Sequence, residues 1–284
     1  MKKVLIIICM LPLFASAQNF HFSLRAGLAS YNGDLKRKSF SPSQSSFFGS
    51  LGARYDISEH IMARTYFSLT SLKGDDKKGT ALMQTRNLDF KTKLFEWELG
   101  AQYNFLNLNE HWWTPYAYLG IGVFHFNPYT KDETGAKTFL KPLSTEGQGI
   151  VAGVKKYSLT QLSIPFGVGA ERSINEDMRV GFEMGYRKLF TDYIDDVSNV
   201  YADQATLFAA KGQKAVDLAY RGDEVGSGPY PAANITRGNP NSKDGYFYVA
   251  ITFTVRYWFD KYKKTAGLPS YHRNKKLGCP STRY

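Results

Sequence analysis

Apolar and polar residues alternate along eight separate stretches of the chain. In the first stretch, Phe22, Leu24 and Leu28 alternate with Ser23 and Arg25. A period of two residues is typical of a β-strand whose two faces meet different surroundings. The eight stretches lie at about residues 22–28, 47–57, 61–70, 95–105, 116–123, 161–169, 179–187 and 247–257. The sequence therefore predicts eight strands, and residues 86–94 are expected to extend the fourth beyond a membrane.

The connections between these stretches differ in length in a regular way. Those after the second, fourth and sixth stretches are short, whereas those after the first, third, fifth and seventh are long, and the last covers about residues 190–243. Short turns at one end and long loops at the other are typical of outer-membrane barrels. We therefore predict an all-β fold: an eight-stranded antiparallel transmembrane β-barrel with short periplasmic turns, long extracellular loops and both termini in the periplasm.

A soluble sandwich or barrel would also show alternating strands and is the competing interpretation. The polar faces of the strands favour the membrane barrel, because they carry charges that a closed interior can pair. These charged residues are Arg25, Arg54, Arg64, Glu96, Glu98, Arg179, Glu183, Arg187 and Arg256. An eight-stranded barrel is only wide enough for its own side chains, so we expect a polar plug that keeps the barrel closed rather than a substrate channel.

The N-terminus has the pattern of a cleaved export signal. Lys2 and Lys3 precede an apolar run from Val4 to Phe14, and a small-x-small site comes just before Gln18. The run is too short to span a membrane as a helix. We expect residues 1–17 to be a signal peptide, 18–260 the barrel and 261–284 a basic periplasmic tail. Removal of the signal would take Cys9 and lower the formal net charge of +11 by two.

Residue types needed for catalysis are present but are not grouped. The histidines His21, His60, His111, His125 and His272 do not match a catalytic triad or a zinc site in the predicted topology. We therefore expect no enzyme activity and no cofactor, although barrels that act as acyltransferases or proteases keep an enzyme as an open alternative. An exported basic chain is expected to meet acidic surfaces or partners rather than nucleic acid.

The longest loop contains an acidic motif, FTDYIDDVS, at residues 190–198. Asp192, Asp195 and Asp196 have the oxygen ligands that calcium prefers, but their spacing does not match an EF-hand. Asp also caps turns and helices, so we favour a role in folding the loop, with Tyr193 in the same motif. Residues 200–221 are expected to form one or two short helices.

The last residues form a basic tail that is too charged to fold alone. A solubilising tail is one interpretation, and ordering on a partner is the other. The possible anchors for a partner are Tyr271, Arg273, Lys275, Lys276, Cys279 and Pro280. Cys279 would be the single cysteine of the mature chain, which suggests an intermolecular disulfide or a free reactive thiol.

Several stretches resemble the DUF6089 family of PorG-like outer-membrane barrel components of the type IX secretion system. They are YNGDL (31–35), RNLDFKT (86–92), FHFNP (124–128), FTDYIDDVS (190–198), RGNPNSKDGYFY (237–248) and the Cys-Pro near the end. The resemblance implies a non-enzymatic role in the secretion machinery. It also implies association with a periplasmic ring of a PorK-like lipoprotein and a PorN-like partner. We expect docking through the tail and periplasmic turns, with a disulfide from Cys279 to the lipoprotein as a hypothesis. The alternative is a stand-alone surface barrel that acts in adhesion or ligand binding through its extracellular loops.

Overall fold

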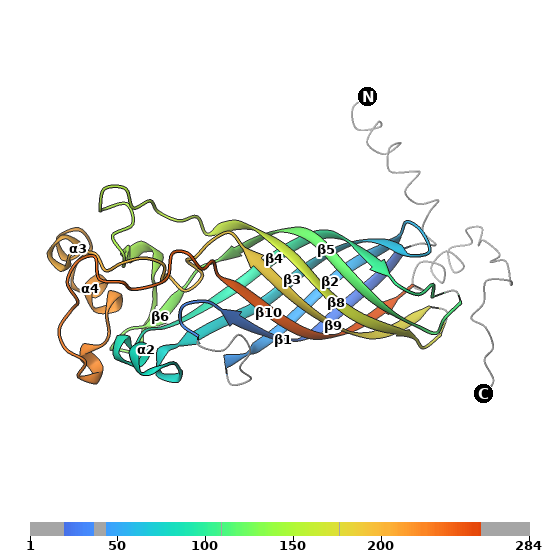
Figure 1. Cartoon of the computed structure of the whole chain (residues 1–284), viewed down its shortest axis with the longest axis horizontal. Helices are drawn as coiled ribbons and strands as arrows, with labels where there is room; N and C mark the ends of the chain where they lie inside the picture. Colours follow the sequence, from blue (N-terminus) through green and yellow to red (C-terminus); the bar gives the residue numbers. More distant parts are fainter. Residues whose placement is uncertain (1–19, 37–43, 109, 176, 257–284) are drawn as a thin grey trace, which may run out of the picture.

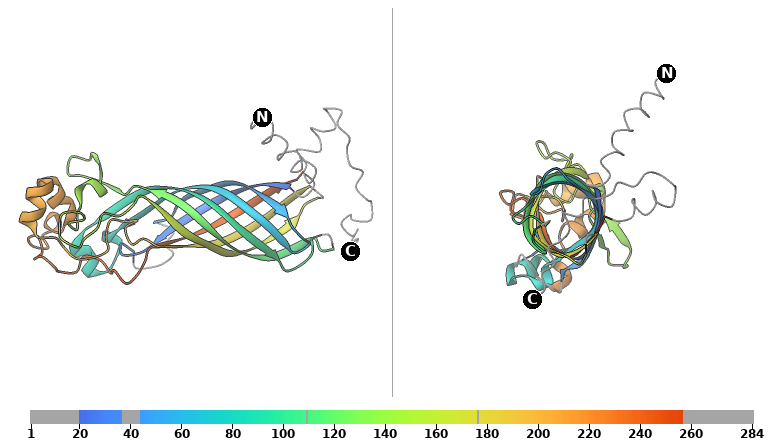
Figure 2. Two further views of the ribbon diagram at one scale, coloured as in Figure 1. Left: turned by 90° about the horizontal axis from the view of Figure 1, so that it is seen from above. Right: turned by 90° about the vertical axis from the view of Figure 1, so that its right-hand side faces the viewer.

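The eight predicted strands form a closed antiparallel barrel. The computed structural model describes residues 20–36, 44–108, 110–175 and 177–256. The barrel strands are β1 (Phe20–Asn32), β2 (Ser46–Asp56), β3 (Ile61–Asp75), β4 (Asp89–Asn104), β5 (Trp113–Phe126), β8 (Thr160–Ser173), β9 (Met178–Leu189) and β10 (Gly245–Val255). Each strand pairs with its neighbours in the chain, β10 pairs with β1, and the ring closes without a free barrel edge (Figure 2). The predicted eight-stranded antiparallel barrel is confirmed.

Side chains alternate between the inside and the outside of the barrel, as the hydropathy pattern predicts. On β4, Phe95, Trp97 and Leu99 are exposed on the outer surface, whereas Glu96 and Glu98 are buried inside. The outer surface is therefore apolar, as expected for a surface in contact with lipid. At the end that carries the short turns it has large aromatic side chains: Tyr103, Phe105, Trp112 and Trp113.

Glycines let two strands approach where a side chain would collide. Gly100 and Gly120 lie opposite each other on β4 and β5. A Cβ atom added to either would lie 2.5 Å from a carbonyl oxygen of the facing strand. The inward row of each strand therefore combines small residues with long polar ones, which fits a narrow interior.

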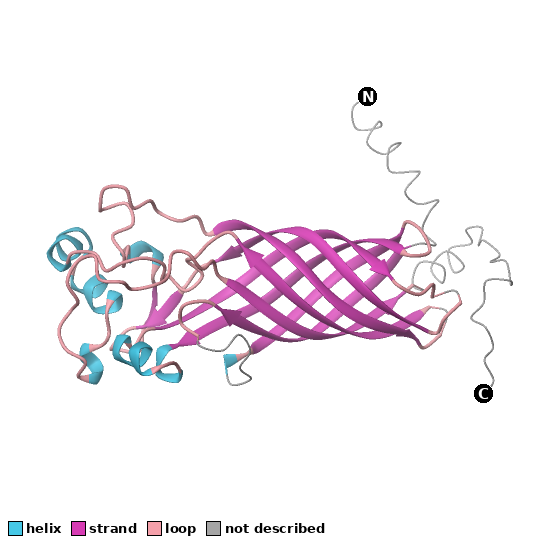
Figure 3. Ribbon diagram, viewed as in Figure 1, coloured by secondary structure: helices cyan, strands magenta, loops and turns pink. Residues whose placement is uncertain are grey.

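The long connections fold together at one end of the barrel, and we call residues 33–36, 76–88, 127–159 and 190–244 the cap (Figures 1 and 3). The cap contains η3 (Asp76–Lys78), α2 (Ala81–Arg86), the hairpin β6 (Tyr129–Lys131) and β7 (Lys137–Phe139), η4 (Lys141–Leu143), α3 (Gln204–Lys211), α4 (Gln213–Ala219) and η5 (Asp223–Val225). The helices α3 and α4 lie within the predicted helical region, whereas the β6–β7 hairpin was not anticipated. None of the helices in the described ranges is long and apolar enough to cross a membrane.

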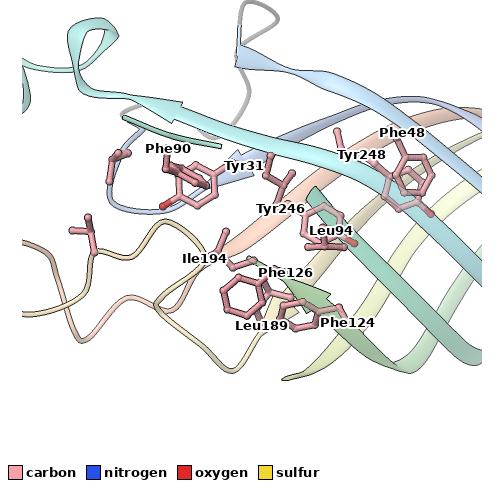
Figure 4. Close-up of a cluster of buried hydrophobic side chains, with 14 of the residues drawn as sticks. Tyr31, Phe48, Phe90, Leu94, Phe124, Phe126, Leu189, Ile194, Tyr246 and Tyr248 are labelled. Carbon is pink, nitrogen blue, oxygen red and sulfur yellow. The ribbon is translucent and has the colours of Figure 1, made fainter. Parts of the chain in front are cut away.

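An apolar cluster joins the cap to the barrel (Figure 4). Barrel residues such as Tyr31, Phe90 and Phe126 contribute to it together with the cap residues Ile194 and Val197. All five are at most 1% exposed. Burying side chains of this size contributes about 1.5–3 kcal/mol each. The cap is therefore packed onto the barrel rather than attached only by flexible connections.

Candidate functional site: the plug and the cap

Charged residues fill the middle of the barrel, and we call Arg25, Arg54, Arg64, Arg187, Glu96, Glu98, Glu171 and Glu183 the plug. All eight are at most 2% exposed. The carboxylate of Glu183 accepts from Arg25 Nη1 and from Arg64 Nη1, both at 2.9 Å. Glu98 also lies between several arginines, with Arg25 at 3.2 Å, Arg64 at 3.3 Å and Arg187 in contact. These guanidinium groups come from three different strands, so the pairs cross the barrel and link its walls.

Hydroxyl groups add hydrogen bonds to the plug, and aromatic rings add cation–π contacts. Glu96 accepts from Arg187 at 2.7 Å, from Ser163 at 2.6 Å and from Tyr246 at 3.0 Å. The guanidinium carbon of Arg25 lies 3.6 Å from the centre of the Tyr66 ring. Buried charges are costly unless they are paired and hydrogen-bonded, and each of the four plug carboxylates has an arginine partner. The arrangement is a closed set of fixed charges that holds the barrel walls together.

The plug extends toward the end with the short turns through Arg54 and Glu171. Arg54 Nη1 donates to Glu171 at 2.7 Å, and Arg179 approaches the same carboxylate at 3.6 Å. Glu171 is not among the predicted interior charges, because the apolar alternation predicts that the sixth strand ends at residue 169, whereas the strand extends to Ser173. The period of two does extend to this residue, since Glu171 continues the inward series of Ser163, Gly167 and Gly169. Arg256 is partly exposed just beyond β10 and its backbone N–H donates to Asp177.

The Asp-rich motif folds the cap by hydrogen bonds. Asp192 accepts from Ser198 Oγ at 2.7 Å. Asp196 accepts from Thr145 Oγ1 at 2.5 Å and from the Tyr157 hydroxyl at 2.6 Å. Tyr193, whose ring stacks on that of Tyr157, adds an apolar contact. Asp195 bonds to Tyr31, and the same hydroxyl lies 3.1 Å from Asp244.

The Asp residues therefore point to different partners rather than to one ion. Among the described residues, no three His, Cys, Asp or Glu side chains are grouped so that they could hold a metal ion. These contacts support the loop-folding interpretation of the motif.

Four of the stretches that resemble the DUF6089 family meet in the cap. Asp34 accepts from the backbone N–H of Asn239 at 2.7 Å. Arg86 donates to the carbonyl oxygens of Asp34 and Arg237. Arg237 in turn donates to Glu146 Oε1 at 3.0 Å and to the carbonyl oxygen of Asp196 at 2.6 Å. Segments that are up to two hundred residues apart in the chain thus form one polar core.

Burial changes the protonation of the cap acids. Desolvation raises the pKa of Asp192 and of Asp196 to about 6. It also raises the pKa of Asp195 and of Asp244, and the nearby carboxylates of Asp34, Asp192 and Asp195 add to this effect. Hydroxyl groups donate to these carboxylates, and the charge of Arg237 also lowers the pKa of Asp196, but these effects do not offset the loss of water. The cap therefore contains carboxyl groups that take up protons in mildly acidic solution.

The remaining candidate residues lie apart from these two regions. His21 contacts Asp56 at 2.8 Å near the end with the short turns, His60 bonds to the carbonyl oxygen of Asn104, and His125 bonds to Thr160 on the outside of the barrel. His111 is exposed. The predicted signal peptide, His272 and the partner-binding candidates Tyr271, Arg273, Lys275, Lys276, Cys279 and Pro280 lie outside the described residues.

A family model described as "Outer membrane protein beta-barrel domain" matches residues 4–210, which is more than half of the chain. The chain belongs to this family. It is thus an outer-membrane β-barrel protein, and the membrane interpretation of its alternating strands is correct. No curated protein matches this barrel.

Solved structures that resemble this barrel are distant in sequence. Neisserial surface protein A is 12% identical with a TM-score of 0.43, over 84% of this chain and 97% of that chain. A major outer membrane protein from Thermus thermophilus is 11% identical with a TM-score of 0.40, over 83% and 99%. OprG from Pseudomonas aeruginosa is 11% identical with a TM-score of 0.39, over 82% and 95%.

Proposed function

We propose that this barrel is a non-enzymatic component of the type IX protein secretion machinery. In this role the closed barrel anchors the protein in the outer membrane, with the cap outside the cell and both termini in the periplasm. The tail and the periplasmic turns dock on a ring formed by a PorK-like lipoprotein and a PorN-like partner. The barrel interior transports nothing, because the plug fills it.

The observation that supports this proposal is the set of hydrogen bonds that residues of the DUF6089-like stretches make in the cap. Asp34, Arg86, Asp195 and Arg237 come from four of these stretches, and all are engaged in the polar core of the cap. Each is held by hydrogen bonds within the cap rather than directed at a group of catalytic residues. The residues of the DUF6089-like stretches hold the cap in its folded form. This use is more typical of a structural component than of an enzyme.

The test is export of cargo by cells whose barrel lacks the tail. Residues 261–284 are replaced by a flexible Gly/Ser segment of equal length, and insertion of the barrel is checked in isolated outer membranes. We expect export of type IX cargo to stop although the barrel is still inserted, because the docking segment is missing. As a matched control, Lys155→Gln with Lys156→Gln removes two exposed cap charges and should leave export unchanged. Normal export by the tail variant would contradict docking through the tail.

The proposed disulfide of Cys279 is tested separately, by electrophoresis without reductant. The disulfide hypothesis predicts that the chain runs with the ring lipoprotein on a non-reducing gel, and that Cys279→Ser shifts it to monomer mass. A wild-type band at monomer mass without reductant would show a free thiol and reject the disulfide, while the docking role would still be judged by export.

The exposed apolar side chains of the cap favour a second candidate, a surface barrel that binds a ligand or a neighbouring cell. Leu82 is 82% exposed, and Phe208 and Ile235 are each more than half exposed. If this candidate is correct, the tail variant exports cargo normally and Leu82→Ser with Phe208→Ser abolishes cell attachment. The two candidates thus predict opposite results from the same strains.

A further inference from the structure

Lysines gather on the outer face of β3 and β4 where these strands leave the apolar surface. Lys91 and Lys93 continue the outward row of Phe95 and Trp97 on β4, and both are exposed. Lys73 lies directly opposite Lys91 in the register of the two strands. Their neighbours Leu72, Phe90 and Thr92 are buried inside the barrel, so the three ammonium groups lie on the outer side of the sheet.

This arrangement places like charges together without acidic partners. Lys73 and Lys91 form a directly opposed pair, which is unfavourable in a sheet. Within the ranges that the structure describes, no carboxylate forms an ion pair with Lys73, Lys77, Lys78 or Lys91. A site that concentrates positive charge at some cost to stability is suited to a negatively charged ligand.

These lysines line a pocket at the junction of the barrel and the cap. The pocket has a volume of about 390 Å³, and its lining includes Lys73, Lys77, Lys78 and Lys91 together with Asp75 and Asp89. Its volume is within the range of small-molecule sites, about 300–1,000 Å³. Four of its side chains are lysines, and ammonium groups are good partners for phosphate.

The two acidic residues of the pocket are already engaged. Asp89 pairs with Arg221 and accepts from Thr130 at 2.9 Å. Asp75 accepts from the backbone N–H of Lys77 at 3.0 Å, at the start of η3. Both lie farther from the apolar surface than Lys73 and Lys91, so an anion would approach from the side of the membrane.

The position of the lysines relative to the apolar surface decides which anion fits. Lys93 and Lys91 lie two and four residues beyond the exposed Phe95 on the same strand. At about 3.4 Å per residue they are roughly 7 and 14 Å along the strand, and less in height because barrel strands tilt. Flexible lysine side chains reach the level of lipid headgroups from such positions. The outward lysines therefore lie beside lipid, near the leaflet that the cap faces.

We propose that the pocket of Lys73, Lys77, Lys78 and Lys91, together with Lys93 below it, binds the phosphate groups of a phosphorylated glycolipid in this leaflet. The acyl chains of the lipid lie along the exposed Leu69 and Phe95. The phosphates neutralise the opposed lysine pair, and the sugar occupies the pocket. This site is independent of the secretion role proposed above, since it requires neither the tail nor a periplasmic ring.

The experiment measures binding of diphosphorylated lipid A to the full-length barrel in detergent micelles or in phosphatidylcholine nanodiscs. The test variant is Lys73→Gln with Lys91→Gln, and Lys155→Gln with Lys156→Gln is the control with the same change of charge. Each lysine near an anionic lipid surface changes affinity about 5-fold, so we expect the test variant to bind about 30-fold more weakly. The control should bind like the wild type. Lys73→Arg with Lys91→Arg should retain binding, and circular dichroism verifies that each variant is folded.

Two further ligands separate the possible sources of the phosphate. Dephosphorylated lipid A should bind as weakly to the wild type as lipid A binds to the test variant. Inorganic phosphate should compete only at far higher concentration than lipid A, because it lacks acyl chains. Equal affinity of the test variant and the wild type would overturn the proposal, as would equal binding of the two lipids. Competition by inorganic phosphate at the concentration of the lipid would indicate a small-anion site and reject the glycolipid.

Discussion

The plug and the cap both bury carboxylates, but they surround them with different partners. In the plug, Glu183 faces the guanidinium groups of Arg25 and Arg64. In the cap, Asp196 faces the hydroxyl groups of Thr145 and Tyr157. Glu146 in the cap does have an arginine, Arg237, so the cap combines both kinds of partner.

The difference shows how one chain uses buried carboxylates for two purposes. A guanidinium partner fixes a carboxylate in its charged form, and pairs of this kind in the plug bridge strands on different sides of the barrel. Hydroxyl partners satisfy the hydrogen bonds of an acid but leave it free to take up a proton. The plug therefore behaves as a permanent internal brace, whereas the stability of the cap depends on pH.

The largest effect is expected from breaking the plug. Glu183→Gln removes the charge that faces Arg25 and Arg64 and leaves both guanidinium groups buried without it. Loss of one partner of a buried ion pair typically costs about 3–5 kcal/mol. We expect a decrease of this size in the free energy of unfolding, measured by urea titration of the barrel in lipid vesicles. Glu133→Gln, at an exposed position of the cap, is the control and should change it by less than about 0.5 kcal/mol. An equally small effect of both changes would show that the ion pairs do not brace the barrel.

A smaller effect is expected from the pH dependence of the cap. The pKa of Asp196 is raised to about 6 by burial, above the ordinary value near 4, so the folded cap binds this proton more tightly than the unfolded cap. The resulting stabilisation is complete below about pH 4 and is lost as the pH rises through 6. We expect the cap to be about 2–3 kcal/mol more stable at pH 4.5 than at pH 8, by amide hydrogen exchange corrected for intrinsic rates.

The variant Asp196→Asn sharpens this prediction. It keeps the shape of the side chain and removes one of the cap carboxyls whose pKa is raised, so the part of the pH dependence that comes from Asp196, about 2 kcal/mol, should be lost. Amides of β4 and β9 in the same sample report on the barrel. A cap of the wild-type chain that is more stable at pH 8 than at pH 4.5 would contradict the assignment of raised pKa values.

The smallest effect is expected at the edge of the cap. Asp203 is the N-cap of α3 and accepts from the backbone N–H of Thr206 at 2.9 Å. Asp203→Ala should cost about 1 kcal/mol and increase hydrogen exchange in α3 only. Asp203→Asn retains the acceptor and should behave almost like the wild type. Faster exchange throughout the cap would mean that α3 helps to hold the polar core together, which its exposed position does not suggest.

The fold was predictable because lipid outside and paired charges inside impose a strict period of two. That period placed all eight strands and the inward side of Arg25, Arg64, Glu98 and Glu183. The strand ends were less certain: Glu171 was missed because the apolar alternation of its strand weakens after residue 169. The β6–β7 hairpin was missed because its strands have three residues each, which is too short for a periodic signal.

The partners of each charged residue could not be predicted from the sequence. Alternation shows that Glu183 points inward, but it does not show that Arg25 and Arg64 reach it, since this depends on the stagger of strands around the ring. In the same way, the motif at 190–198 shows three acids close together in the chain. Only the folded cap reveals that Asp192, Asp195 and Asp196 point to different partners.

The sequence by itself determined the number of barrel strands, the two faces of each of these strands and the end at which the long loops gather. These features follow from local periodicity, which a membrane barrel enforces along every strand. The tertiary structure alone decided which charges neutralise one another, which acids lie beside hydroxyl groups, and that lysines from β3 and β4 share one pocket with η3. Such contacts join residues far apart in the chain, and their distances exist only once the barrel has closed and the cap has packed onto it.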